Sequence, residues 1–393
     1  MCYNLRMQWF SFGEKGKKFL IIDIASGSVG AAVVRIARDA RPIILFTARE
    51  AIAPAEELTP EHFFSATLHA LKELCTHLFK LYRSEMAGVE RAHLFLRAPW
   101  VVSKTRSVRA EFSEPSVITE ALLSSVIREA ENGITENFRA AHREVASAVR
   151  VVEKKITEFR VNGYAVASAL DKEARTLELT LLESFAPENA IVKFDTLFDS
   201  LTHAPREYHA GAAAAHGALS ASTTEERGDA LTMCVGSEAT ELCVERNEIL
   251  QEVISVPVGV RTVARGAVGE GVFDSVSSAE SFLRAASVQT LSDTRRVSVE
   301  SARDGAGERL KRTITDTLAP KIKNGFSPAR AIVLCDEKDV SLCEQVFPLQ
   351  MKFTVRGAET FSNSVVSMRH AILDTFLSAD AVFVALYEEG KKL

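Results

Sequence analysis

The stretch FLIIDIASGSV, residues 19–29, joins an apolar strand to a loop of small residues. The strand is apolar throughout except for Asp23, and the loop that follows it reads ASGS. Residues 29–36 and 42–46 come next and are rich in β-branched or large apolar side chains, as strands are. The stretch therefore predicts the start of a three-stranded antiparallel meander with a small-residue first connection.

The same pattern returns in the second half of the chain. Residues 230–235 are apolar, residues 236–240 read GSEAT, and residues 242–245 and 249–256 again have the composition of strands. A repeat whose period spans a whole domain indicates a duplicated lobe, because solenoid repeats are much shorter. We expect two lobes that each open with a strand, a small polar loop and two further strands.

Helices are expected beside the first meander. Thr59 suits an N-cap and Pro60 suits the first helical position, and apolar residues then recur at helical spacing up to Tyr82. Residues 93–96 form the next expected strand, and the Ala-rich stretch around residues 212–215 is expected to be a helix.

Residues 101–203 have a different organisation. Strand-like residues 103–112 precede a helix, and two further strand-like runs, 151–161 and 176–182, follow around an Asn162-Gly163 turn. A second helix ends this region near Leu201. We predict a small α+β subdomain that is inserted into the first lobe.

The predicted organisation therefore has five parts, and residues 381–387 are read as the last strand of the second lobe. The parts are a flexible N-terminal segment (1–18), a first lobe (19–100 plus 204–222), an inserted interaction subdomain (101–203), a second lobe (223–387) and a short charged tail (388–393).

Composition excludes several classes of protein. The chain has 393 residues, 47% hydrophobic and 25% charged, with a net charge of −5, so neither global disorder nor a general attraction to nucleic acid is indicated. Its six cysteines form no CxxC pair and its nine histidines no HExxH motif, which favours a reducing cytosol over a disulfide framework or a zinc motif.

No run of apolar residues reaches the roughly 18 residues that a membrane-spanning helix needs. We expect a cytoplasmic protein without strong direct membrane binding. The amphipathic segment 1–18 is the alternative membrane contact.

Two facing loops of glycine and serine have a chemical use. Backbone N–H groups in such loops approach phosphate oxygens closely, and serine hydroxyls add donors. An aspartate at the end of the leading strand can hold Mg²⁺ through water. An ordinary turn with a polar residue at a strand end explains the same residues, and both readings stay open.

The motifs resemble those of the actin, Hsp70 and sugar-kinase superfamily. IDIASGSV (22–29) resembles the first phosphate motif, usually Asp-x-Gly-Ser/Thr. VGSEATEL (235–242) resembles the second, usually Asp-x-Gly-Gly-Gly-Thr-Thr-Asp, and PVG (257–259) resembles the Pro-x-Gly that follows it. The insert with its Asn-Gly turn is similar to the FtsA and PilM branch. The resemblance covers about residues 18–387 and implies an α/β fold of two actin-like (RNase H-like) lobes with an inserted strand-helix-strand-strand subdomain.

The sequence departs from these motifs at both loops. Ala25 replaces a glycine, Cys234 replaces the aspartate that opens the second motif, and Glu241 replaces the one that closes it. Glu238 adds negative charge to the loop, and CDE (335–337) stands where the resemblance implies a bare Gly-Gly turn at adenosine. We expect ATP and Mg²⁺ to bind weakly or not at all. The resemblance assigns no catalytic residue or metal ligand with certainty. The vestigial nucleotide-binding residues would be Asp23, Ser26, Gly27, Ser28, Gly236, Ser237, Thr240 and Glu241.

The resemblance implies a scaffold with little or no ATPase activity. It would bind membrane-associated proteins of type IV pilus assembly or cell division at the inner face of the cytoplasmic membrane, with self-association as a further possibility. A PilM-like protein typically grips a short N-terminal tail of a membrane partner, whereas an FtsA-like one typically carries a C-terminal amphipathic helix. The charged end of this chain favours the PilM role. The alternative is a working ATPase or small-molecule kinase on the same fold.

Overall fold

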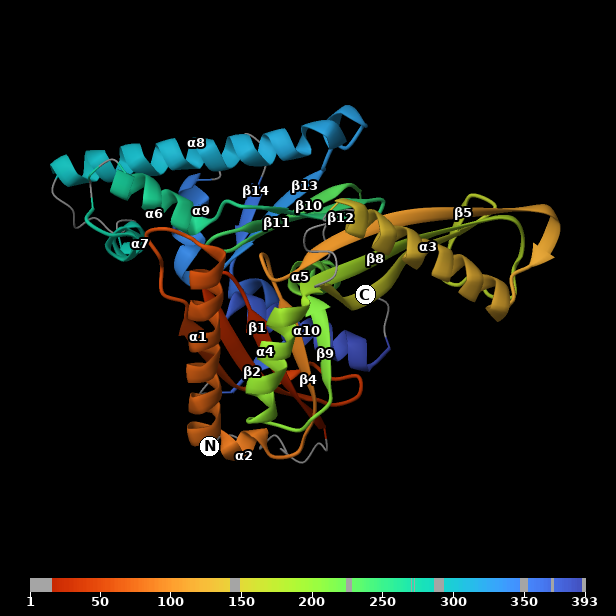
Figure 1. Cartoon of the computed structure of the whole chain (residues 1–393), viewed down its shortest axis with the longest axis horizontal. Helices are drawn as coiled ribbons and strands as arrows, with labels where there is room; N and C mark the ends of the chain where they lie inside the picture. The colour runs from red at the N-terminus through yellow and green to blue at the C-terminus, as the bar shows by residue number, and fades with distance from the viewer. Residues whose placement is uncertain are drawn as a thin grey trace, which may run out of the picture.

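The computed structural model shows two lobes and an elongated subdomain that projects from them (Figure 1). The predicted N-terminal segment lies outside the described residues up to residue 15, as does the tail from residue 391. No helix within the described ranges is both long and apolar enough to cross a membrane. The residues described are 16–141, 149–223, 228–269, 271, 273–285, 293–346, 353–368 and 371–390.

The first lobe is built on a six-stranded sheet of order β15-β3-β2-β1-β4-β9. β1 to β3 form the predicted antiparallel meander, while β4 pairs parallel to β1 and β9 parallel to β4. β1 is buried almost along its whole length, because helices cover both faces of the sheet. The strands are β1 (Lys17–Ile24), β2 (Ser28–Ile36), β3 (Ile43–Ala51), β4 (Val89–Leu96), β9 (Arg206–Ala210) and β15 (Val366–Ser367).

Five helices pack on this sheet. The Thr59 side chain accepts a hydrogen bond from the backbone N–H of His62 at the start of α1, as the N-cap prediction requires. Trp100, just after β4, is 6% exposed and stacks on Phe63 of α1. The helices are α1 (Pro60–Leu81), α2 (Arg83–Met86), α4 (Glu188–Asp199), α5 (Gly211–Ser222) and α10 (Thr375–Glu388).

The second lobe repeats the plan with a five-stranded sheet of order β12-β11-β10-β13-β14. β10 lies between antiparallel β11 and parallel β13, as β1 lies between β2 and β4. The predicted duplication is therefore present in the sheet topology. The elements are β10 (Ala230–Val235), β11 (Thr240–Arg246), β12 (Ile249–Val256), α6 (Val260–Gly269), α7 (Val276–Ala285), α8 (Asp293–Lys323), β13 (Arg330–Cys335), η2 (Glu337–Asp339), α9 (Val340–Val346) and β14 (Phe353–Arg356). The short helix η3 (Ala358–Phe361) follows β14 but places Phe361 in the first-lobe core.

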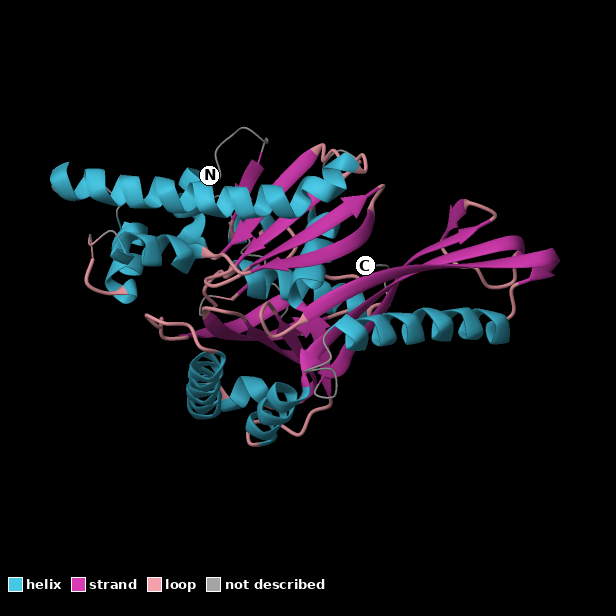
Figure 2. Cartoon of the chain, turned by 45° about the horizontal axis from the view of Figure 1, so that its top comes forward, coloured by secondary structure: helices cyan, strands magenta, loops and turns pink. Residues whose placement is uncertain are grey.

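The projecting subdomain is a four-stranded sheet of order β5-β8-β6-β7 covered on one face by a helix (Figure 2). Asn162 and Gly163 both have positive φ and join β6 to β7 in a two-residue hairpin, as the sequence predicted. The elements follow the order strand, helix, strand, short strand, strand: β5 (Val102–Val117), α3 (Glu120–Ala141), β6 (Val149–Val161), β7 (Tyr164–Val166) and β8 (Glu173–Pro187).

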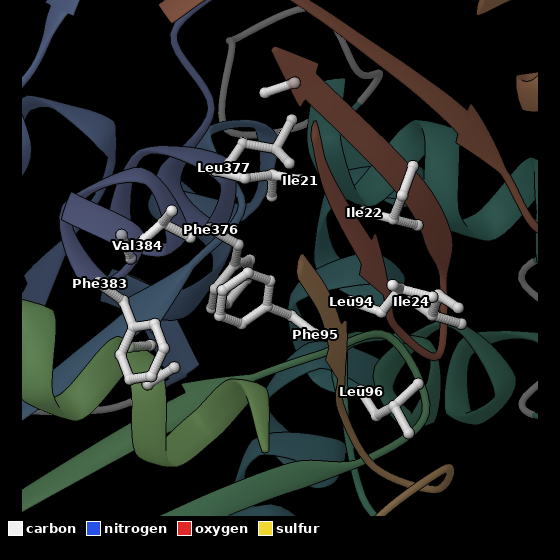
Figure 3. Packing of buried hydrophobic residues seen from close by; sticks show 14 of the residues in the cluster. Ile21, Ile22, Ile24, Leu94, Phe95, Leu96, Phe376, Leu377, Phe383 and Val384 are labelled. Atoms are coloured by element: carbon white, nitrogen blue, oxygen red, sulfur yellow. The ribbon is translucent and has the colours of Figure 1, made fainter. Parts of the chain in front are cut away.

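The prediction of a final strand at residues 381–387 is wrong, because these residues belong to helix α10. Asp374 caps this helix by accepting a hydrogen bond from the backbone N–H of Leu377 at 2.9 Å. Figure 3 shows α10 side chains such as Phe376 and Phe383 packed against Ile21 and Phe95 of the first lobe. The helix is buried on nearly all sides, so residues 375–386 are apolar apart from Thr375, Ser378 and Asp380 and carry no period that separates helix from strand.

Two boundaries of the predicted parts also need correction. β15 pairs with β3, and α10 packs on the first-lobe sheet, so the chain returns to the first lobe before residue 387. Helix α4 was assigned to the insert, yet its Phe194 and Phe198 are buried in the first-lobe core beside α1. Both errors arise because membership of a core depends on contacts between segments that are distant in sequence.

Candidate functional site

The two small-residue loops, residues 25–27 and 236–239, touch each other where the lobes meet. The Ser26 hydroxyl accepts a hydrogen bond from the backbone N–H of Glu238 at 3.0 Å. A Cβ atom on Gly27 would lie 1.8 Å from Ser237 Oγ and 2.4 Å from Ser237 Cβ, so only glycine allows this approach. The loops therefore pack on each other across the lobe boundary.

Asp23 and Cys234 hold equivalent positions in the two sheets. Each is the last residue but one of its lobe's central strand, and each is followed by a small-residue loop. Asp23 pairs in register with Gly30, and Cys234 with Glu241. The pseudo-symmetric site thus has one aspartate in the first lobe and an uncharged thiol in its place in the second.

Two arginines hold the Asp23 carboxylate. Arg97 Nε donates to Asp23 Oδ1 at 2.6 Å, and Arg49 Nη2 donates to Asp23 Oδ2 at 3.0 Å. Asp23 is 0% exposed and Arg97 is 4% exposed, so these ion pairs are removed from water. Both carboxylate oxygens therefore face permanent cations instead of the hydrated Mg²⁺ that the motif suggests.

The ion pairs continue into α10. Arg49 contacts both oxygens of Asp374, at 2.6 and 2.9 Å, and Arg97 Nη2 contacts Asp380 Oδ1 at 2.9 Å. Burial opposes the charge of Asp374, but the bonded Arg49 outweighs it and lowers the pKa of this carboxyl. Burial raises the pKa of Asp380 well above its ordinary value, although Arg97 acts in the opposite direction. Two arginines therefore join three carboxyl groups, those of Asp23, Asp374 and Asp380, in one network.

Glu241 and Cys234 lie beside this network, and burial favours the uncharged form of both side chains. Burial raises the pKa of Glu241 to about 7, although Arg97 and the backbone N–H of Ala98 act in the opposite direction. Burial also raises the pKa of the Cys234 thiol to about 12. Neither side chain offers a full carboxylate charge where the second motif normally has one.

Glu238 has a different role from the one its charge suggested. Arg265 contacts both of its oxygens, at 2.7 and 2.9 Å, and Arg261 lies 3.4 Å from Oε1. The two arginines on α6 also donate to backbone carbonyls of the first lobe, Arg261 to Ile52 at 2.6 Å and Arg265 to Ala55 at 3.3 Å. This Glu238 latch ties the second-lobe loop to the first lobe.

The space left between the loops is too small for a nucleotide. The cavity at the junction measures about 20 Å³, which holds about one water molecule. The backbone N–H groups of Val260 and Arg261 at the start of α6, which could bind an anion, donate instead to the carbonyls of Gly236 and Ser237. The residues present therefore do not fit Mg²⁺ and a triphosphate in this arrangement, and weak or absent ATP binding stays a prediction.

The structure brings most of the predicted residues to one place. Thr240 and Asp23 are the two predicted residues that do not line the junction cavity. The Thr240 hydroxyl donates to the carbonyl of Val258, and the Asp23 carboxylate is bonded to Arg49 and Arg97. The predicted residues that line the junction cavity are Ser26, Gly27, Ser28, Gly236, Ser237 and Glu241.

Sequence reasoning missed the four residues that surround Asp23. Arg49 and Arg97 lie at the ends of strands, and Asp374 and Asp380 lie at the start of and within α10. One signal was available, because an aspartate inside an apolar run such as residues 375–386 must be paired or neutral once the run is buried. That signal identifies Asp380 but not its partner.

Comparison with known proteins settles the fold. No protein-family model and no curated protein matches the sequence. Among solved structures, the chain is similar to the PilM-PilN type IV pilus biogenesis complex, with 13% identity, a TM-score of 0.63 and coverage of 94% of this chain and 98% of that chain. A diol dehydratase-reactivating factor in nucleotide-free form matches with 8% identity, a TM-score of 0.44 and coverage of 95% and 100%. A Bacteroides thetaiotaomicron protein with an actin-like ATPase fold matches with 7% identity, a TM-score of 0.39 and coverage of 95% and 98%. The chain has the actin-like ATPase fold, and this prediction is confirmed.

Proposed function

We propose that the chain is a PilM-type scaffold that binds a membrane-associated protein of pilus assembly and does not hydrolyse ATP. The similarity to the PilM–PilN complex spans nearly the whole of both chains, insert included, and supports the choice of a pilus role over a division role. In this role the protein sits at the inner face of the cytoplasmic membrane through its partner.

The observation that carries the proposal is the contact between the two loops. In a working ATPase of this fold the phosphates lie between two such loops, and closure of the lobes reports the nucleotide state. Here Gly27 and Ser237 leave no gap, and the Glu238 latch joins the lobes through direct contacts between protein groups. The lobes then form a fixed platform rather than a nucleotide-driven hinge.

The projecting subdomain is the partner surface that we favour. It extends away from both lobes (Figure 1) and exposes two large apolar side chains, Tyr164 at 77% after the β6–β7 turn and Val117 at 55% at the end of β5. Apolar side chains that are exposed on a projecting element can contribute to an interaction surface. In the subdomain sheet β5 is an edge strand, and β12 of the second lobe lies beside part of it. An extended peptide could pair along the remainder of this strand.

Two measurements on the full chain test the proposal. The first is binding of a synthetic peptide with the cytoplasmic N-terminal sequence of the PilN-type protein from the same organism, followed by fluorescence polarisation. We expect micromolar or tighter binding, no binding of a scrambled peptide, and at least about tenfold weaker binding for Tyr164→Ser. The matched control is Val297→Ser on α8, which is 63% exposed and far from the subdomain along the chain.

The second measurement is calorimetry with Mg·ATP. We expect a dissociation constant no tighter than the millimolar range, and Asp23→Ala should lower thermal stability without changing nucleotide affinity. Micromolar affinity that Asp23→Ala abolishes, together with no peptide binding, would show that the protein is an ATPase or kinase.

A further inference from the structure

A second buried polar cluster lies in the first lobe, away from the loops. His93 on β4 and Glu207 and His209 on β9 point to the same face of the sheet, since His93 pairs in register with Glu207 and His209 follows two residues later. His93 is 0% and His209 is 3% exposed. Tyr387 of α10 packs its ring against both histidine rings, so the cluster is enclosed between sheet and helix.

The donor atoms of the three residues converge. His93 Nδ1 lies 3.0 Å from His209 Nε2, and one ligand atom from each of the three side chains lies within 4.8 Å of the others. Two imidazole nitrogens bound to one tetrahedral Zn²⁺ at the usual bond lengths are about 3.4 Å apart. The two nitrogens would therefore need to move slightly apart to bind such an ion.

A carboxylate stands behind each histidine. Glu153 Oε1 lies 3.6 Å from Nδ1 of His209, and Glu388 Oε1 lies 3.2 Å from Nε2 of His93. The backbone N–H of Ala210 donates to Glu153 Oε2 at 3.0 Å and fixes that carboxylate. A histidine that binds a metal through one nitrogen almost always directs the other to a carboxylate or carbonyl, and this arrangement has that form twice.

The cluster also leaves a polar atom unmatched. Arg91 binds Glu207 Oε1 at 2.9 Å, but Glu207 Oε2 is buried and makes no hydrogen bond with any group that the structure describes. Buried polar atoms are nearly always paired, so this carboxylate oxygen beside two imidazoles is a free acceptor that a metal ion could use.

A hollow in the surface lies next to the cluster. A hollow of about 440 Å³ is lined in part by Phe19 and Glu388. The Phe19 ring lies 5.7 Å from that of His93, and Glu388 contacts His93 directly. The hollow therefore shares a wall with the cluster.

We propose that His93, His209 and Glu207 bind one Zn²⁺. The nitrogen and carboxylate donors suit this metal, and three protein ligands leave a fourth position for water. The ion joins β4 to β9, the strand that leads out of the insert region, beneath α10. Its role is then to fix the first lobe on the side that faces away from the loops.

Zinc titration of the untagged full chain after treatment with chelator tests the proposal, with a chromophoric competitor for affinity and elemental analysis for stoichiometry. We expect one Zn²⁺ per chain with a rise in the melting temperature. Since changing an outer partner of a metal site costs about 10–100-fold in affinity, His93→Gln and His209→Gln should weaken binding by more than this. Glu207→Gln, at a half-buried position, keeps the test valid if a histidine variant fails to fold.

Two controls separate this site from other histidines. His216→Gln changes a buried histidine that pairs with Glu245 at 2.8 Å, and His69→Gln changes an exposed one on α1. Both should bind one Zn²⁺ with wild-type affinity. The proposal is overturned if the folded wild-type chain binds no Zn²⁺, or if folded Glu207→Gln retains wild-type affinity.

Discussion

The two loops that meet at the lobe junction have the same origin in the fold but different surroundings. In the first lobe the aspartate at the strand end is retained, and cations of the same lobe surround it. In the second lobe the aspartate is replaced by Cys234, and the charge has moved into the loop as Glu238, which joins the lobes through α6. One loop is followed by a buried network within its own lobe and the other takes part in the contact between the lobes, so equivalent positions of a duplicated fold have different surroundings in one molecule.

The pseudo-symmetry extends to the next strand of each sheet. Leu96 aligns with Ile24 at the end of β4, and Cys335 aligns with Val235 at the end of β13. The residue that follows is Arg97 in the first lobe and Asp336 in the second. Equivalent positions therefore carry opposite charges, and the arginine is the one that neutralises Asp23.

The largest expected effect comes from removing that arginine. Arg97→Met leaves Asp23 with one cation and Asp380 with none, and breaking a buried ion pair on one side costs about 3–5 kcal/mol. Urea denaturation should show this loss in the free energy of unfolding. Arg38→Met, at an exposed ion pair with Asp39, should change stability by no more than about 0.5 kcal/mol.

Adding Asp380→Asn to Arg97→Met should recover part of the loss, because it removes the carboxyl left without a cation. A loss under about 1 kcal/mol for Arg97→Met alone would show that the network does not stabilise the first lobe.

The next largest effect depends on pH and concerns Glu241. Its pKa is raised from 4.5 to about 7 by burial, so the folded state holds the proton more tightly than the unfolded chain does. Stability from this group is complete below the unfolded value and is lost as pH rises through about 7. Wild type should therefore lose up to about 3 kcal/mol relative to Glu241→Gln between pH 4 and pH 8, at about 1.4 kcal/mol per pKa unit.

The measurement is a series of denaturation curves across this pH range for both proteins. The groups that face Glu241, Arg97 and Asp23, are shared by both, so the difference isolates the glutamate. If the stability of wild type and of Glu241→Gln changed with pH in the same way, the raised pKa of Glu241 would be contradicted. Glu308→Gln, on the exposed face of α8, is the control, and its stability should follow that of wild type across the pH range.

Contact between the loops is tested by Gly27→Ala. Gly27 is not among the residues with positive φ, so alanine is permitted by the backbone and only the clash with Ser237 opposes it. Overpacking of this kind costs about 1–3 kcal/mol. Thermal unfolding should show the loss, and combining Gly27→Ala with Ser237→Gly should restore much of it. Equal losses in the single and double variants would show that the loops are not in contact in solution.

The smallest expected effect is that of Ser26→Ala, which removes the hydrogen bond to the backbone of Glu238. We expect a loss of about 1 kcal/mol in the free energy of unfolding, the usual value for one such bond. Ser84→Ala is the control, because that hydroxyl bonds only the neighbouring Glu85 at an exposed site and its loss should be undetectable. A neutral Ser26→Ala would limit the interface to the Glu238 latch.

The sequence by itself determined the elements whose pattern is local. The strands at residues 230–235 and 249–256 were predicted with the bounds that the structure has, and the Asn162-Gly163 hairpin followed from the turn preference of two residues. The duplication of the lobes was also predicted from the sequence, because the same succession of strand, small-residue loop and two strands occurs twice along the chain.

Only the tertiary structure decided which groups pair with the Asp23 carboxylate. Residues 23, 49, 97, 374 and 380 meet because three strands and the last helix pack together, and no local pattern encodes which buried charges will pair. The same holds for α10, whose uniform burial removes the period that reveals a helix. The backbone conformation of a turn or strand depends on the steric preferences of neighbouring residues. The neutralisation of a buried charge depends on groups that only folding brings within reach.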